Sequence, residues 1–188
     1  MLSEILVILA LIVLNGVLAM SELAIVSARP ARLKPLEGKS RGARLALRLG
    51  EDPGRFLSTV QIGITAVGIL SGALSGATLG ERLEDWLLLQ GVRPDWATTL
   101  GVGGVVIAIT YVSLIIGELV PKQIALRNPE GIAIRMAPAM TLLSIVAAPL
   151  VWFLDRSGKV VLWLMGQRGD SQNRVTEEEV HVLLAEAH

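Results

Sequence analysis

The chain has 188 residues, of which 52% are hydrophobic and 18% are charged, and its mean hydropathy is +0.60. This composition is too apolar for an ordinary soluble domain and is typical of a membrane domain. Seventeen basic residues balance seventeen acidic ones, so no net charge favours nucleic acid as a partner, and the absence of cysteine excludes disulfides, thiolate metal sites and cysteine nucleophiles.

Three apolar segments predict membrane-spanning helices, at residues 5–26, 56–79 and 97–120. Each is long enough to cross roughly 30 Å of hydrocarbon as a helix. The first segment follows Glu4 directly and is too long for the core of a signal peptide, so we interpret it as a span.

A fourth apolar segment, residues 136–154, contains Pro138 and Pro149. Prolines remove helical hydrogen bonds and favour kinks or breaks. Irregular backbone is permitted inside a membrane where protein or water covers it. We therefore expect this segment to form a membrane-embedded helical hairpin that is broken at its prolines, rather than a complete crossing.

The distribution of charge predicts the topology. The loop after the second span is mainly acidic, whereas the loop after the first span holds eight basic residues: Arg29, Arg32, Lys34, Lys39, Arg41, Arg44, Arg48 and Arg55. By the positive-inside rule the first loop is cytoplasmic, which places the N-terminus outside and the C-terminus inside. The fold we expect is an all-α, multi-pass protein, with a transmembrane ion-transport domain at residues 1–154 and a juxtamembrane linker at 155–188.

Small residues recur along the second predicted span. Glycines at intervals of four place one stripe on a helix face, and two serines flank it: Gly68, Gly72, Gly76 and Gly80, with Ser71 and Ser75. Such stripes pack helices or a dimer seam. Hydroxyl groups and locally freed carbonyls beside an ion path are a second interpretation, and the two are compatible.

Two carboxylates lie inside the apolar segments, Glu22 near one end of the first span and Glu118 near one end of the third. A charged side chain costs roughly 2.5–3.5 kcal/mol at the centre of a membrane helix, so it usually faces protein or water and marks a pathway. We expect both to lie at a similar depth and to share a cavity. In the alternative interpretation they pair with Lys122 or Arg29, or reach the interface.

Oxygen atoms are the only metal ligands that the spans offer, which suits a hard cation such as magnesium, sodium or calcium. Pro121 has no N–H to donate to the carbonyl of Gly117, so we expect that carbonyl to remain free. Asn15 is another oxygen ligand, although a lone asparagine in a span more often bonds a neighbouring helix.

Several motifs together resemble the transmembrane domain of the CorC/cyclin M (CNNM) magnesium-transporter family. They are Leu14-Asn15-Gly16, Met20-Ser21-Glu22, Gln61-Ile62-Gly63-Ile64-Thr65, Ile69-Leu70-Ser71-Gly72 and, most specifically, Gly117-Glu118-Leu119-Val120-Pro121-Lys122. Many members have Ile-Gly-Asn-Thr where this chain has Ile62-Gly63-Ile64-Thr65. The resemblance implies a homodimer in the cell membrane that exports Mg²⁺, in exchange for Na⁺. It also implies cytosolic nucleotide-binding CBS domains after the chain, to which residues 175–180 begin an acidic helical linker.

We therefore predict one magnesium site between the three spans. Its expected ligands are Ser21, Glu22, Gly63, Ser71, Ser75, Gly117 and Glu118. Residues with expected structural or gating roles are Asn15, Gly68, Gly72, Gly76, Pro121 and Lys122. The competing interpretation is a membrane scaffold or regulatory anchor, in which the glycines dimerise and the basic loop binds anionic lipid. Motifs of hydrolases and phosphate-binding enzymes are absent from the sequence, which favours a protein that is not an enzyme.

Overall fold

The structure is a computed structural model that describes residues 2–166, and over this range every regular element is a helix. The all-α prediction is thereby confirmed. The chain divides into two compact units, Met1–Val151 and Trp152–His188, and the described part of the second is the last stretch of one helix. The predicted acidic linker at 175–180 lies outside the described residues.

Four helical stretches are long and apolar enough to cross a membrane. The first is α1 (Leu2–Ser27), and the last is α8 (Pro129–Leu164). The second consists of α4 (Pro53–Ser75), a π-helical turn η2 (Gly76–Gly80) and α5 (Glu81–Leu89). The third consists of α6 (Pro94–Leu114), a second π-helical turn η3 (Ile115–Leu119) and α7 (Val120–Arg127). The first three contain the three predicted spans and extend beyond them, which establishes a multi-pass architecture.

Proline defines where the long helices begin. Pro53, Pro94 and Pro129 each occupy the first position of a helix, where the missing N–H group has no intrahelical partner to lose. The carboxylate of Asp52 caps the start of α4 by accepting a hydrogen bond of 3.2 Å from the backbone N–H of Arg55. The connections before α6 and α8 are short, residues 90–93 and Asn128, whereas the connection before α4 holds three further helices.

The predicted hairpin at residues 136–154 is wrong, because α8 continues as one helix through Pro138 and Pro149. Neighbouring groups compensate for the bonds that a proline removes. The carbonyl that Pro138 leaves without its helical donor belongs to Ile134, and it packs against Gly42 so closely that a Cβ there would collide with it. Proline is a strong helix breaker in water, but it is tolerated here because another helix covers the freed carbonyl.

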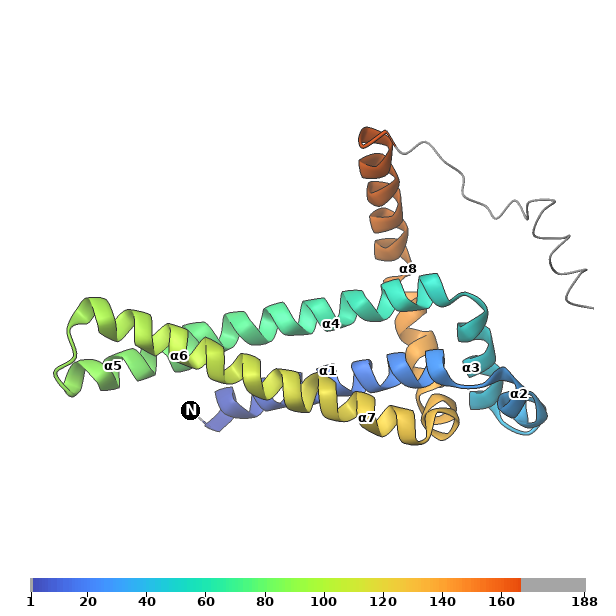
Figure 1. Cartoon of the computed structure of the whole chain (residues 1–188), viewed down its shortest axis with the longest axis horizontal. Coiled ribbons are helices and arrows are strands. Elements are labelled where there is room, and N and C mark those ends of the chain that lie inside the picture. Colours follow the sequence, from blue (N-terminus) through green and yellow to red (C-terminus); the bar gives the residue numbers. More distant parts are fainter. Residues whose placement is uncertain (1, 167–188) are drawn as a thin grey trace, which may run out of the picture. The chain divides into compact units, whose positions relative to one another are not determined.

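In the first unit, α1 lies beside α4 on one side and beside η3 and α7 on the other (Figure 1). A core of small and aliphatic side chains joins these helices to the start of α8: it includes Leu18, Ala24, Val60, Ala125, Ala133 and Ala137. The buried alanines allow the helix backbones to approach one another.

The end of α1 and the start of α8 lie at the same end of the first unit. The backbone N–H of Arg29 donates to the Glu130 carboxylate at 3.4 Å, and the Arg32 guanidinium lies 3.6 Å from the same oxygen atom. The connection that follows α1 and the connection that follows α7 therefore contact each other, as expected if both lie at the same membrane face. Which face this is stays a prediction.

Three short helices follow α1 at this end: α2 (Pro30–Leu33), η1 (Lys34–Leu36) and α3 (Arg41–Glu51). Helix α3 is amphipathic, because Ala43 and Ala46 are buried whereas Arg44 and Arg48 are exposed. The hydroxyl of Ser40 caps it by accepting from the backbone N–H of Ala43.

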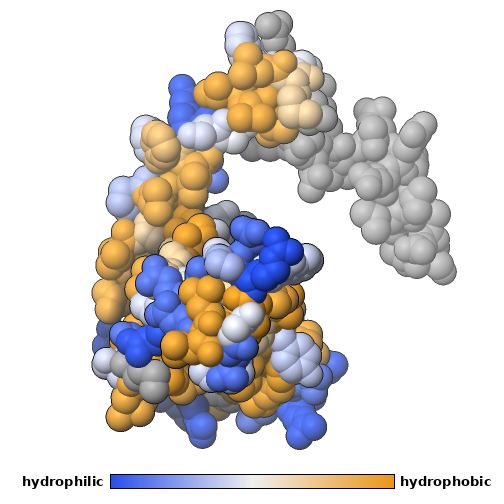
Figure 2. Space-filling model, turned by 90° about the vertical axis from the view of Figure 1, so that its left-hand side faces the viewer, coloured by the Kyte–Doolittle hydropathy of each residue, from blue (hydrophilic) through white to orange (hydrophobic). Residues whose placement is uncertain are grey.

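The opposite end of the first unit is a helical hairpin of α5 and the start of α6. Gly101 packs directly on the backbone of Glu84, and Arg82 forms an ion pair of 3.1 Å with Glu4 of α1. Figure 2, which looks onto this end, shows hydrophilic and hydrophobic side chains mixed on the surface. Such mixing suits a segment that lies at or beyond the membrane boundary.

Candidate functional site: a polar cavity at a helix crossing

The site begins with a close crossing of α1 over the π-helical turn η3. A Cβ on Gly16 would lie 3.0 Å from both the carbonyl oxygen of Ile116 and the side chain of Pro121. A Cβ on Gly117 would lie 3.3 Å from the carbonyl oxygen of Ile12. Glycine on both helices therefore permits backbone contact inside the bundle.

Asn15 fastens this crossing. Its side-chain amide donates a hydrogen bond of 3.1 Å to the carbonyl of Gly117. The prediction that this carbonyl remains free is wrong, because a donor 102 positions earlier in the chain takes the place of the N–H that Pro121 lacks. The alternative role of Asn15, a bond to a neighbouring helix, is confirmed.

The π-helical turn sets the direction of the acidic side chain. Within η3 the backbone N–H of Val120 bonds to the carbonyl of Ile115, one residue further back than in an α-helix. Such turns occur frequently at functional sites. Glu118 lies inside this turn and faces α1.

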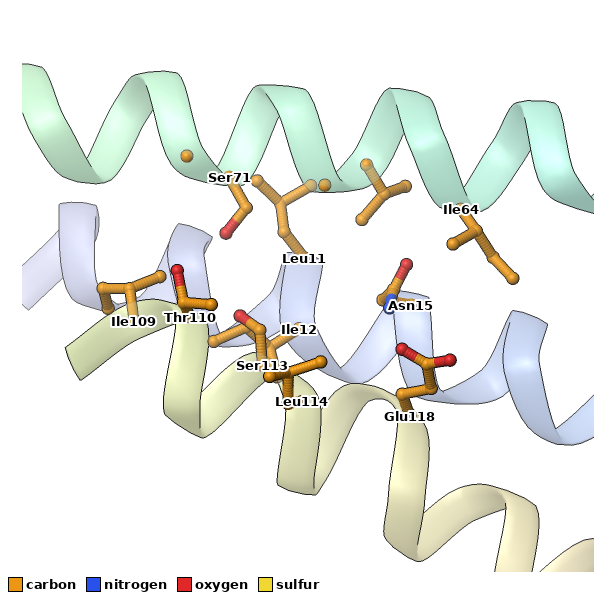
Figure 3. A pocket seen from close by; sticks show the side chains of 13 residues that line it. Leu11, Ile12, Asn15, Ile64, Ser71, Ile109, Thr110, Ser113, Leu114 and Glu118 are labelled. Atoms are coloured by element: carbon orange, nitrogen blue, oxygen red, sulfur yellow. The ribbon is translucent and has the colours of Figure 1, made fainter. Parts of the chain in front are cut away.

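A cavity of about 230 Å³ opens between α1, α4 and the α6–η3 helix. Its polar lining comes from all three, as Figure 3 shows, with Asn15 near Glu118 and the Ser71 hydroxyl directed toward α6. The polar lining residues are Asn15, Ser71, Thr110, Ser113 and Glu118. The remaining walls are aliphatic side chains and the glycines Gly68 and Gly72.

Two oxygen atoms in this lining are buried without a hydrogen-bond donor. They are Oδ1 of Asn15 and Oγ of Ser71, whose residue is only 5% exposed. An amide oxygen can only accept, so it needs a donor or a cation. Buried polar atoms of this kind are rare and call for an explanation such as water or an ion.

Among the described residues, Glu118 is the only carboxylate in the cavity lining. Its Oε1 lies 2.7 Å from Nζ of Lys122, one helical turn further on, and its side chain is 42% exposed. The alternative interpretation of the sequence, in which Glu118 pairs with Lys122, is therefore confirmed. Because the ammonium group of Lys122 neutralises the Glu118 carboxylate, this ion pair leaves little net charge at the cavity.

The structure does not bring every predicted ligand to this cavity. Ser21 and Glu22 do not line it, since they follow Asn15 by six and seven residues, about 9–10 Å along the helix. Ser21 is buried and donates to the carbonyl of Val17, whereas Glu22 is half-buried and has no partner among residues 2–166. Ser75 is buried one turn beyond Ser71 and donates to the carbonyl of Gly72.

The glycines of the second span divide into two groups. Gly63 faces Leu18 of α1, and Gly80 packs against Val102 of α6, so both serve contacts within the chain. A Cβ on Gly68, Gly72 or Gly76 would meet nothing within 4 Å. The open part of the stripe therefore makes no close helix contact within the described chain.

Thr110 and Ser113 line the cavity although the sequence analysis did not select them. The sequence did indicate that both could line the same site as Gly117. They precede Gly117 by seven and four residues, so they share its helix face. Hydroxyl groups are common in apolar helices, which is why this signal was weak. Groups of three or more histidine, cysteine, aspartate or glutamate side chains able to hold a metal are absent from the described residues.

The helices and the cavity define a multi-pass, all-helical membrane domain with a polar site inside its bundle. Residues 6–188 match the family described as the cyclin M transmembrane N-terminal domain, CNNM. The chain belongs to this family, which confirms the resemblance read from its motifs.

Three relatives of the chain illustrate the names found in this family. The UPF0053 protein sll0260 of Synechocystis is 47% identical over 96% of the chain, and the polyamine export protein of Haemophilus influenzae is 30% identical over 96%. The polyamine export protein of Escherichia coli is 28% identical over 98%. The chain spans about two fifths of the length of these curated relatives, 41%, 42% and 41% respectively.

Proposed function

We propose that this domain exports Mg²⁺ in exchange for Na⁺, and that the cavity between α1, α4 and η3 binds the cation during its passage. One observation carries the proposal: the unpartnered oxygens of Asn15 and Ser71 share the cavity with the carboxylate of Glu118. Three oxygen types converge there from three helices, which is the ligand chemistry that hard cations require.

The ligand set suits a transported ion better than a resident one. A single carboxylate with neutral oxygens binds a divalent cation weakly enough for release, and magnesium keeps several of its waters when bound. The volume of about 230 Å³ leaves space for water beside the ion. The hydroxyls of Thr110 and Ser113 are positioned to bond to such water.

Lys122 competes with the cargo for Glu118. The ion pair of 2.7 Å occupies the carboxylate, so an entering cation has to displace the ammonium group before it binds directly. Lys122 then acts as a tethered cation that keeps the empty cavity neutral. This competition favours release once the cargo has weakened its other contacts.

Ser21 and Glu22 belong to a second position on the same path in this proposal. They lie on α1 between the cavity and the end that carries the basic loop, and Glu22 has no partner among residues 2–166. Two sites in sequence let an ion leave one as it enters the next. Ser75 and Gly63, which were also predicted as ligands, lie on α4 on either side of the cavity.

Flux of Mg²⁺ into proteoliposomes, with and without a Na⁺ gradient, tests the proposal. We expect a Glu118→Gln variant to lower Mg²⁺ affinity about tenfold, the equivalent of ~1.4 kcal/mol. A Lys122→Met variant is expected to bind Mg²⁺ more tightly, because the competing ammonium is gone. Glu81→Gln, at the far hairpin, is the matched control and leaves flux unchanged. Unchanged flux in Glu118→Gln refutes the site, and absence of any cation flux in the unmodified protein favours the scaffold alternative.

Polyamine export is the second candidate, favoured by the names of the Haemophilus and Escherichia relatives. The aliphatic walls of the cavity, formed by residues such as Leu11, Ile64 and Leu114, also suit an alkylammonium chain beside one carboxylate. Spermidine and Mg²⁺ compared in the same flux assay decide between them. Transport of spermidine with no response to Mg²⁺ replaces the magnesium proposal.

The assembly in this proposal is a homodimer in the cell membrane. A Cβ on Gly76 would meet nothing within 4 Å, so this part of the second span is open to close approach by a second copy, whereas Gly68 and Gly72 line the cavity. Mass measurement in detergent tests it, since a monomer at all concentrations excludes a dimer. CBS domains that follow in the family are expected to regulate the transport.

Topology is tested by labelling. We propose that the basic loop is cytoplasmic. In this cysteine-free chain, Lys39→Cys is then protected from a membrane-impermeant thiol reagent added outside, whereas Gln90→Cys is labelled. Labelling of Lys39→Cys together with protection of Gln90→Cys would show that the basic loop lies outside.

A further inference from the structure

A second cavity, of about 550 Å³, lies at the end of the first unit that carries the basic loop. It is bounded by the last turns of α1, by α2 and α3, and by the first turn of α4. Its volume falls within the roughly 300–1,000 Å³ that is typical of ligand pockets. None of the residues that line the first cavity, between α1, α4 and the α6–η3 helix, lines this second one.

The walls of this second cavity are mainly apolar, and its charged groups are few. Ile25, Val26, Leu33, Leu47, Leu49 and Phe56 supply the large side chains of the lining. Within residues 2–166, Lys34 and Glu51 are the only charged residues in the lining. An apolar space of this size is a poor site for water and a good one for hydrocarbon.

We expect the cavity to lie at the depth where lipid headgroups meet acyl chains. Helix α1 ends at Ser27 and α4 begins at Pro53, so the ends of two membrane-length helices line it. The exposed residues Arg41, Arg44 and Arg48 recur at intervals of three and four on one face of α3. Amphipathic helices with a basic face lie in the interface of membranes that contain anionic lipid.

The charge of this region selects the headgroup. Between residues 28 and 55 there are eight basic and three acidic side chains. Such a surplus attracts anionic lipid, whereas a zwitterionic headgroup gains little from it. We propose that the cavity binds one anionic phospholipid, with an acyl chain between α1, α3 and α4 and its phosphate beside Lys34.

Gly50 provides a way to fill the cavity without disturbing the fold. It lines the cavity from α3, and a Cβ at this position would meet nothing within 4 Å. Gly50→Phe therefore adds a ring at the lining of the space that we assign to the acyl chain. Gly50→Ala adds only a methyl group and is the matched control, and Gly54→Phe, which is equally open but outside the cavity, controls for position.

Native mass spectrometry of the delipidated, detergent-purified chain tests the proposal by titration with phosphatidylglycerol and with phosphatidylcholine of the same acyl chains. We expect one phosphatidylglycerol per protomer, bound about tenfold more tightly than phosphatidylcholine. Gly50→Phe should lose this binding, whereas Gly50→Ala and Gly54→Phe retain it. Lys34→Gln should reduce the preference for phosphatidylglycerol, and Lys39→Gln, outside the cavity, should not.

Four results overturn the proposal. The first is unchanged phosphatidylglycerol binding in Gly50→Phe. The second is equal affinity of the unmodified protein for the two lipids. The third is saturation by glycerol 3-phosphate alone, which shows a site for soluble phosphate. The fourth is a change of particle mass in Gly50→Phe, which shows that the cavity belongs to a contact between copies of the chain. If Gly50→Phe loses thermal stability, Lys34→Gln replaces it as the test, and an unchanged preference of Lys34→Gln for phosphatidylglycerol then takes the place of the first result.

Discussion

At the crossing of α1 and η3, Gly16 and Gly117 bring two helices into backbone contact, whereas a Cβ on Gly72 of α4 or Gly76 of η2 would meet nothing within 4 Å. The regular spacing of the stripe made it the stronger signal in the sequence. Gly16 and Gly117, which belong to no regularly spaced stripe, are the glycines at the helix crossing beside the cavity. Periodicity shows which glycines share a face, but only the fold shows whether another helix occupies that face.

Gly42 offers the sharpest test of this comparison. Its Cβ would collide with the backbone carbonyl of Ile134, which cannot move as a side chain would. We expect Gly42→Ala to destabilise the domain by about 3 kcal/mol, near the upper range for overpacking. Gly50→Ala in the same helix is open and should gain up to about 1 kcal/mol from helix propensity. Thermal unfolding in detergent, followed by circular dichroism, measures both, and equal midpoints contradict the packing described here.

Gly16→Ala is expected to have the next largest effect. The added Cβ presses on the carbonyl of Ile116 at 3.0 Å, so we expect a loss of about 1–2 kcal/mol. Cation flux should fall with it, because α1 carries Asn15 beside the cavity. Gly103→Ala in α6, where a Cβ meets nothing, is the control. A variant with normal flux and normal stability would show that the crossing tolerates a wider separation.

Asn15→Leu removes the amide that bonds to the carbonyl of Gly117. We expect a loss of about 1 kcal/mol, because the carbonyl loses its donor inside the bundle. Ser144→Ala serves as the contrast: its hydroxyl is buried with no partner, so its removal should cost nothing. Equal unfolding midpoints in the two variants would mean that the bond to Gly117 adds no stability.

Gly72→Ala should have the smallest effect on a single copy, because its Cβ faces open space. We expect a change of about 1 kcal/mol or less, in the stabilising direction. Gly76→Leu, which lies outside the cavity lining, should by contrast weaken the proposed dimer, which sedimentation in detergent would detect. If Gly72→Ala already unfolds the monomer, the stripe has contacts within the chain and the comparison fails.

Composition and segment length were sufficient to predict the membrane class and the three spans, because the need to cross a hydrocarbon layer acts on every residue of a segment. The rule that proline breaks a helix, from which we predicted the hairpin at residues 136–154, acts on single residues. Pro138 lacks a donor in any setting, but only the fold shows that Gly42 covers the carbonyl it leaves free. Tertiary contact therefore overrode a local rule.

The candidate site was predictable in its parts and not in its grouping. Glu118, Asn15 and Ser71 were all selected from the sequence as polar groups in apolar helices, and the structure brings them to one cavity. Ser21 was selected on the same grounds but lies elsewhere on α1. The pairing of helices decides which levels of α1 and α4 face each other, and this register is not encoded in either helix alone.

The π-helical turn η3 also has a consequence for insertions and deletions. At about 100° per residue, an unbroken α-helix would carry Glu118 about 80° past the direction of Thr110, eight residues earlier. The wider turn rotates less per residue and returns Glu118 toward the face that Thr110 shares with the cavity. The turn thus shifts the helical phase between α6 and α7. Removing one residue between Ile115 and Gly117 would place Glu118 seven residues after Thr110, about 20° short of two full turns, so a uniform α-helix without the extra residue would keep Glu118 on the same face. The wider turn therefore accommodates one extra residue without turning Glu118 away from α1.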